Sequence, residues 1–384
     1  MQALICYSFT CAGFFLLAFI AFFNPVKVNI VANKWFGVFL FSLGCMLLNA
    51  IIYQFGKPEN YTKLLAFNEL SRFAMAPALY LSVVYFTSPD KAFKKRDYFH
   101  FIPFAVFLLF IVPGLFGERI NILSGNLPGI VSAVLSQLAF FSVKIQLVVY
   151  WLLSFYRLRQ HQKNIRLINS TIKPIDLSWL KYLLLGIVGM IILWLNELFF
   201  RISVLSAFAP LGYATGVLLI SYFLLAQKEI YPFEEAELND ISLIINNTEE
   251  EAREVKQRLT DDQLITLKAR LIFLMENEKI YLDNELNLPQ LAKRMGVSSH
   301  DLSYLLNKGF NKNFFQFVNA YRVSEAKQLM QSDSHKHLNL LGIAYSSGFN
   351  SKTTFNISFK KETALSPTQF IQQLKEEHTP PSLQ

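Results

Sequence analysis

The chain has 384 residues, of which 53% are apolar, 17% are charged and 15% are aromatic, with 37 phenylalanines. Water-soluble domains contain about a quarter charged residues, so this composition argues against a single soluble enzyme domain and predicts a lipid-embedded part. The net charge is +11 over residues 1–226, −8 over 227–285, +7 over 286–375 and −2 from the two glutamates that follow, so we expect a membrane part, an acidic connector, a basic module and a tail over 376–384.

Seven segments are long and apolar enough to cross the roughly 30 Å hydrocarbon core of a bilayer. They run over residues 3–23, 35–55, 64–87, 99–116, 130–156, 180–200 and 207–226. The first resembles a signal peptide, but no basic residue precedes it and further apolar segments follow, so we interpret it as a retained helix. The sequence therefore predicts an all-α protein with a seven-transmembrane-helix bundle over residues 1–226.

Basic residues in the loops predict the orientation of this bundle. With the amino terminus outside, the inside loops hold twelve Lys and Arg residues and the outside loops hold four. We therefore expect a multi-pass protein of the cytoplasmic (inner) membrane, in contact with lipid, whose residues after Ala226 lie in the cytoplasm.

Four ionisable residues within the predicted spans need partners: Glu69, Arg72, Lys144 and Glu197. A charge within a bilayer costs roughly a few kcal/mol, so each should face a partner or a water-filled cavity. Glu69 and Arg72 share a helix face because they are three residues apart. Two interpretations stay open: an internal ion-pair set that holds the bundle together, or a pocket for an anionic or zwitterionic ligand, either a small molecule or a membrane component.

The acidic connector is predicted to be a juxtamembrane linker over residues 227–263, with the stretches EEAE and NTEEEAREVKQRLTDD. Leucines at positions 259, 264, 267, 271 and 274 recur at helical spacing, which predicts a helix with one buried face. Both packing on the following domain and pairing with its copy in a homodimer remain open for this helix.

The basic module begins with the pattern of a helix-turn-helix. Gly296 permits a tight turn, and a second helix begins at Ser298 with Asp301 three residues on, which is a capping-box arrangement. The apolar residues expected to pack inside are Leu288, Leu291, Ala292 and Met295 on the first helix, and Leu302, Leu305 and Leu306 on the second.

A second copy of the pattern follows in LNLLGIAYSSGFNSKTTFNISFKK. Gly348 marks its turn, Ser351 is the expected helix cap, and Ile343, Ala344, Phe355 and Phe359 are expected inside. The segment FFQFVNAYRVSEAKQLM between the copies predicts an uninterrupted spacer helix. Two such motifs on one spacer can reach neighbouring major-groove segments, roughly 34 Å apart.

Residues 264–375 resemble the DNA-binding domain of the arabinose-operon regulator (AraC/XylS) family. The strings YRVSEAK, GFNSKTTF and LSPTQF at these distances carry the resemblance, which covers under a third of the chain. The amino-terminal part resembles a membrane-tethered variant of this family in layout alone. The resemblance implies transcription control by binding double-stranded promoter DNA, with the helices that begin at Ser298 and Ser351 as readers.

Matching positions imply which side chains touch DNA. The implied base contacts are His300, Ser303 and Tyr304 on the first reader and Lys352, Thr353 and Asn356 on the second, and the expected phosphate contacts are Lys308, Lys312, Lys360 and Lys361. Asn can bond adenine and Lys guanine, while Ser and Thr suit several base edges. The sequence departs from the family at Ile357, where Arg is common, and at Ala364, where Gly is usual in the turn after the second reader.

The main alternative is a membrane transporter or enzyme with an accessory helical domain. The sequence has no P-loop, HExxH or GxSxG motif and no clear internal repeat of the kind found in transporters, so we expect no enzyme. The three cysteines, Cys6, Cys11 and Cys45, lie in apolar runs without metal-ligand spacing, so we expect no metal and no cofactor. The bundle could either sense a signal or only anchor the regulator.

Overall fold

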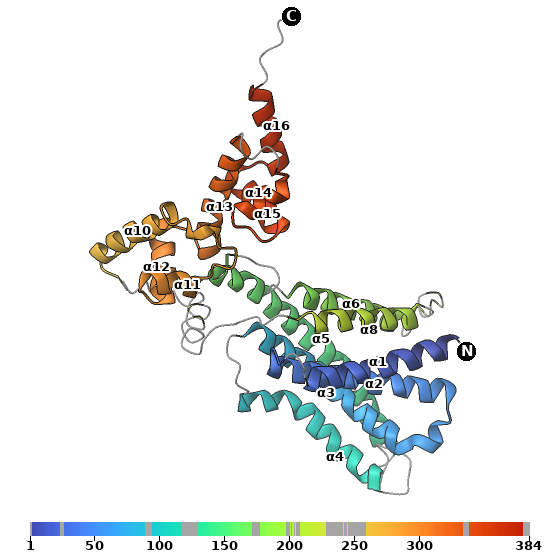
Figure 1. Ribbon diagram of the computed structural model, residues 1–384. Coiled ribbons are helices and arrows are strands. Elements are labelled where there is room, and N and C mark those ends of the chain that lie inside the picture. Colours follow the sequence, from blue (N-terminus) through green and yellow to red (C-terminus); the bar gives the residue numbers. More distant parts are fainter. Residues whose placement is uncertain are drawn as a thin grey trace, which may run out of the picture. The chain divides into compact units, whose positions relative to one another are not determined.

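The computed structural model describes residues 2–23, 27–88, 94–116, 129–170, 177–196, 208–227, 259–332 and 338–378, with isolated positions at 200, 202, 204, 241 and 244. Nearly all of these residues are helical, as the all-α prediction requires. The chain divides into two compact units: Met1–Gln160 with Leu177–Ile230, and His161–Asp176 with Tyr231–Gln384 (Figure 1).

Each of the seven predicted apolar segments coincides with one helix, and these helices lie in the first unit except for the end of α5. These are α1 (Gln2–Phe23), α2 (Ile30–Phe55), α3 (Thr62–Thr87), α4 (Ile102–Phe116), α5 (Gly129–Ile168), α6 (Ser178–Leu195) and α8 (Ala209–Leu225), with short 3-10 turns η1 (Pro58–Tyr61) and η2 (Lys95–Phe101). Among the described residues, four helical stretches are long and apolar enough to cross a membrane: Leu4–Phe23, Ile30–Phe55, Pro58–Thr87 and Gln137–Ile168. The stretches Ser178–Ile192 and Ala209–Leu225 are apolar but shorter.

Helix α2 packs against both α1 and α3. A Cβ atom at Gly37 would lie 3.0 Å from the carbonyl oxygen of Ala18, so the glycine allows α1 and α2 to approach closely. Outward-facing side chains of this unit are also apolar: Leu109 is 74% exposed and Ile145 is 64% exposed. This unit therefore has apolar side chains on its outside as well as in its core.

Helix α5 is longer than the sequence predicted. The apolar pattern placed its end near Tyr156, whereas the helix continues to Ile168, so Arg157 and Arg166, which we expected in a loop, are helical. The boundary between the two compact units falls within this helix, after Gln160. Hydropathy could not locate the helix end because polar residues continue a helix as readily as apolar ones.

In the described part of the chain, the second unit contains eight helices and 3-10 turns after the end of α5. They are α10 (Asp261–Glu276), η4 (Ile280–Leu282), α11 (Leu288–Met295), α12 (Ser299–Phe310), α13 (Phe314–Gln331), α14 (Leu340–Ser346), α15 (Lys352–Thr363) and α16 (Pro367–His378). Helix α10 begins inside the segment predicted as linker, because Thr260 and Gln263 form a capping box at its start. Leu271 and Leu274 are buried on the predicted face of this helix.

Candidate nucleic-acid interface

The first helix-turn-helix forms as the sequence predicted. Gly296 ends α11 with φ +67°, in the left-handed region that favours glycine. Ser298 caps α12: its Oγ accepts a hydrogen bond from the backbone N–H of Asp301 at 3.0 Å and donates to the Asp301 carboxylate at 2.7 Å. The seven apolar residues expected inside this motif are all buried. Caps and core together fix the direction of α12.

The predicted base contacts on α12 differ in exposure. Ser303 and Tyr304 are half-buried, and Lys308 in the last turn is exposed. His300 departs from the expectation, because it is only 6% exposed and therefore does not face solvent in this structure. Helix α12 also contacts α10, a neighbour that the helical pattern alone did not place. A base contact by His300 would require its ring to turn outward, and this contact stays a prediction.

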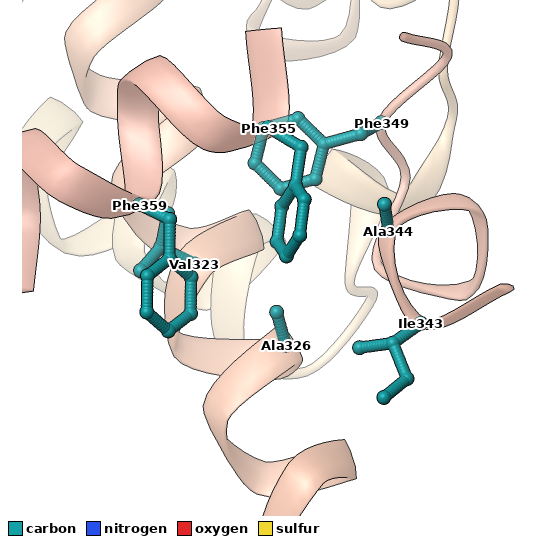
Figure 2. Close-up of a cluster of buried hydrophobic side chains, with 7 residues drawn as sticks. All are labelled: Val323, Ala326, Ile343, Ala344, Phe349, Phe355 and Phe359. Atoms are coloured by element: carbon teal, nitrogen blue, oxygen red, sulfur yellow. The ribbon is translucent and has the colours of Figure 1, made fainter. Parts of the chain in front are cut away.

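The second helix-turn-helix has its own aromatic core. Figure 2 shows side chains from α13, α14 and α15 converging, and Phe349, Phe355 and Phe359 are each at most 1% exposed. The ring centroids of Phe349 and Phe355 lie 5.2 Å apart, in an edge-to-face arrangement. Gly348 occupies the turn with φ +86°, and Ser351 caps α15 by accepting from the Thr354 N–H at 3.1 Å. This core holds α15 through one face and leaves the other face outside.

The outer face of α15 carries every contact predicted for the second reader. Thr354, Phe355, Ser358 and Phe359 are buried, whereas the exposed positions are Lys352, Thr353, Asn356, Ile357, Lys360, Lys361 and, near the end of the helix, Glu362. Lys352, Asn356 and Lys360 follow at intervals of four residues and so share one stripe of the helix. The exposed face is thus cationic and amide-bearing, which suits base edges and phosphates.

Lys312, predicted to touch phosphate, has a partner within the domain. Its Nζ lies 3.5 Å from a carboxylate oxygen of Glu362, near the end of α15. Both side chains are partly exposed, so the pair adds little stability. Lys312 would have to exchange this carboxylate for a phosphate to bind DNA.

Comparison with known proteins agrees with this geometry. Residues 291–373 match a family model described as a helix-turn-helix domain. The carboxy-terminal region is an AraC-type helix-turn-helix domain. No match to the chain was found among curated proteins or among solved structures. The AraC-type domain marks a family of DNA-binding transcription regulators, which are generally not enzymes.

The two departures of this AraC-type domain both lie at its surface. Ile357 is 51% exposed, on the same face as Thr353 and Lys361, so an apolar side chain stands where the family commonly has Arg. Ala364 ends α15 with φ +62° and ψ −6°, so a residue with a Cβ atom occupies the left-handed position. Neither departure removes a helix or a turn.

Arg322 organises the interior of the AraC-type domain, and the sequence interpretation missed it. Its side chain is fully buried, and its Nε and Nη2 donate at 2.7 Å to the carbonyl oxygens of Tyr281 and Asp283. Burial lowers the pKa of Arg322 to about 10, while the two carbonyl oxygens accept hydrogen bonds from its charged guanidinium. A signal was available, because Arg322 lies four residues from both Val318 and Ala326 on the buried face of α13.

A second set of polar contacts also joins η4 and the preceding Lys279 to α13. The Tyr281 hydroxyl donates to Glu325 at 2.7 Å, and the Lys279 ammonium lies 3.1 Å from the same carboxylate. Burial, and then the hydrogen bond and charge of Glu325, raise the pKa of Tyr281 well above its usual range. Together with Arg322, this cluster fastens η4 to the spacer helix α13.

Two of the four ionisable residues predicted within the spans, Glu69 and Arg72, belong to a polar network on α2 and α3. Glu69 and Arg72 make an ion pair at 3.0 Å, as the internal ion-pair interpretation expects. The sequence interpretation missed two neighbours: Asn49 donates to Glu69 at 2.9 Å, and Asn68 donates to Asn49 at 2.7 Å.

The contacts of the two other predicted pocket residues, Lys144 and Glu197, do not decide whether a ligand binds there. The Lys144 ammonium lies over the ring of Phe140, 2.8 Å from its centroid. Glu197 falls outside the described residues. A ligand pocket at Glu69, Arg72, Lys144 and Glu197 therefore stays a prediction.

Proposed function

We propose that this protein is a membrane-anchored transcriptional regulator that reads promoter DNA with α12 and α15. The observation that carries the proposal is the outer face of α15. There Lys352, Thr353 and Asn356 are exposed, while Phe355 and Phe359 anchor the opposite face in the core. A helix held in this way can enter a major groove with its polar side chains directed at base edges.

The roles of the individual side chains follow from their chemistry. We assign base contacts to Lys352, Thr353 and Asn356 on α15, and to Ser303, Tyr304 and, after rotation of its ring, His300 on α12. We assign phosphate contacts to the four lysines at positions 308, 312, 360 and 361. The amide of Asn356 can pair with adenine through two hydrogen bonds, whereas the lysines supply register and salt dependence.

The spacer helix supports reading by both motifs at once. Helix α13 has 18 residues and contacts α12, α14 and α15. A helix of that length is about 27 Å long, which is comparable to the roughly 34 Å between successive major-groove segments on one face of DNA. We therefore propose one continuous site of two half-elements rather than two independent sites.

Membrane anchoring is supported by the helices and exterior of the first unit. We propose that all seven helices α1–α6 and α8 cross the inner membrane, with the amino terminus outside and the AraC-type domain in the cytoplasm. The apolar exterior of the first unit and the excess of basic residues in the inside loops support this arrangement. A reporter fused after Ala226 should behave as cytoplasmic, and a periplasmic signal would overturn the topology.

We further propose that the helices of the first unit sense a signal. The polar network around Glu69 and Arg72 lies within apolar helices, where charged groups commonly mark functional sites. Glu69→Gln and Arg72→Gln should change the transcript levels of the regulated genes at equal protein abundance. Unchanged transcripts would count against a ligand pocket there and favour the anchor interpretation.

The central experiment measures DNA binding by the full-length protein in lipid nanodiscs. Binding to the DNA upstream of its own gene should exceed binding to a scrambled duplex and should weaken steeply with salt. Asn356→Ala should cost about 1–3 kcal/mol on the specific duplex. Lys360→Ala should instead reduce the salt slope by about one and weaken both duplexes alike.

Lys375→Ala is the matched control, because Lys375 is an exposed lysine on α16, away from both readers in sequence. It should leave specificity and salt slope unchanged. Equal affinity for the specific and scrambled duplexes, or an Asn356→Ala variant that behaves like wild type, would refute the proposed function.

A further inference from the structure

The end of α5 belongs to the same compact unit as the AraC-type domain. Residues 161–170, the last two turns of α5 with Asn169 and Ser170, are called the docking segment here. The preceding residues of α5, through Gln160, belong to the other unit, so one 40-residue helix supplies residues to both. Such a helix is about 60 Å long and transmits displacement along its axis better than a flexible linker would.

Directional bonds join the docking segment to the start of the first helix-turn-helix. The Ser170 hydroxyl donates to the carbonyl oxygen of Leu286 at 2.6 Å, and the Asn319 side chain donates to the carbonyl oxygen of Ser170 at 2.9 Å. Asn169 and Asn287 form an antiparallel β-bridge. Ser170, at 0% exposed, is completely enclosed.

Apolar burial accompanies these bonds. Ile165 and Ile168 are 0% exposed, and His161 is 2% exposed. The guanidinium of Arg166 lies 6.0 Å from the ring centroid of Phe315, at the start of α13. The side chains of His161, Ile165 and Ile168 are therefore packed as in a domain core and are not exposed to solvent.

The segment contacts positions that orient the reader without occupying its exposed face. Leu286 and Asn287 immediately precede α11, and Asn287 is the cap of that helix. Asn319 lies on α13 and accepts from the buried Arg322 at 3.3 Å. A shift of the docking segment would thus act on the entry to α11 and on the spacer helix.

We propose that the docking segment is the coupling element through which the membrane part controls the first helix-turn-helix. This inference rests on the proposed function and specifies its regulation. The partner of the docking surface formed by Leu286, Asn287, Phe315 and Asn319 is this segment of the same chain. Movement of α5 in the membrane changes the orientation of α11 and, with it, that of α12.

A cysteine pair tests the docking and the coupling together. Residues opposite each other in an antiparallel bridge have Cα atoms about 4.5–5.5 Å apart, which is within the range that a disulfide spans. The full-length double variant Asn169→Cys with Asn287→Cys should form this bond under mild oxidation in membrane vesicles, as peptide mapping would detect. The two single variants control for bonds to native cysteines and for the loss of the Asn287 cap.

The oxidised and reduced double variant should then differ at least about fivefold in affinity for the upstream DNA in nanodiscs. Ser170→Ala removes the bond to Leu286 and so weakens the contact between the docking segment and the start of α11, which the cross-link strengthens. It should therefore shift the affinity for the upstream DNA in the opposite direction from the cross-link. Thr215→Ala is its matched control, since that hydroxyl donates to the carbonyl oxygen of Leu211 on its own helix, and it should leave affinity unchanged.

The possible results separate the two proposals. Absence of the 169–287 bond, or a cross-linked protein with the affinity of the reduced one, would overturn the coupling while leaving DNA binding intact. Wild-type protein that binds no specific DNA in the same assay would instead overturn the proposed function, and the coupling with it.

Discussion

The two turn glycines of the AraC-type domain have the same backbone class but different surroundings, which makes them a sharp test of the structure. Gly296 has φ +67° and Gly348 has φ +86°, so an alanine at either position would be strained. A Cβ atom at Gly296 would meet nothing within 4 Å. A Cβ atom at Gly348 would lie 2.5 Å from the carbonyl oxygen of Tyr281 and 2.8 Å from the Cα atom of Leu282.

The expected magnitudes follow from these distances. A left-handed L-residue costs about 1–2 kcal/mol, and Gly296→Ala should lose only that amount. Gly348→Ala should lose a further 1–3 kcal/mol or so, because the clash is with backbone and overpacking in an interior costs about that much. The Tyr281 carbonyl cannot move away cheaply, since it accepts the 2.7 Å bond from buried Arg322.

Pulse proteolysis of the full-length protein in nanodiscs, over a urea series, measures the free energy of unfolding of the AraC-type domain. Gly348→Ala should show the lower midpoint, and Gly296→Ala should lie between it and wild type. Equal losses for the two variants would refute the close approach of the second turn to η4. A larger loss for Gly296→Ala would contradict the open space at the first turn.

Three further outcomes are expected. Ala364→Gly should stabilise the domain by about 0.5–1 kcal/mol in the same proteolysis assay, because it relieves the left-handed strain at a small cost in unfolded-state entropy, and a lower midpoint would contradict this. Ile357→Arg should steepen the salt dependence of DNA binding by about 0.9 in the log–log slope, measured between about 50 and 200 mM salt, and an unchanged slope would show that this face does not meet phosphate. The pKa of Tyr281 is raised in the folded state, so above a pH of about 10 the unfolded chain loses this proton first, and the stability of the wild type falls as pH rises. The stability of Tyr281→Phe should fall less steeply over the same range. Urea midpoints of the two proteins that change in parallel with pH would disprove the raised pKa.

The local design of the AraC-type domain was predictable from the sequence. Ser298 and Ser351 were expected as caps and act as caps, and Phe355 and Phe359 were expected inside and are buried. These features depend on residues within about four positions of each other, where helix periodicity and capping chemistry act. The seven apolar segments coincide with helices for the same reason.

Contacts between distant parts of the chain were not predictable in this way. The burial of His300, the bonds from Arg322 to η4 and the pairing of Lys312 with Glu362 all depend on which elements become neighbours. Buried polar residues such as Asn49 and Asn68 give no signal in a hydropathy pattern, because their partners lie on another helix or turn.

Composition, charge and local periodicity by themselves determined the apolar character of the first part, the helical elements and the two helix-turn-helix motifs, because each of these follows from the physical preferences of neighbouring residues. Only the tertiary structure decided where α5 ends and what it touches. Ser170 and Asn319 are separated by 149 positions, yet they share a hydrogen bond within a buried interface. Such a bond forms because folding excludes water around both groups, and this exclusion depends on the packing of all the elements around them.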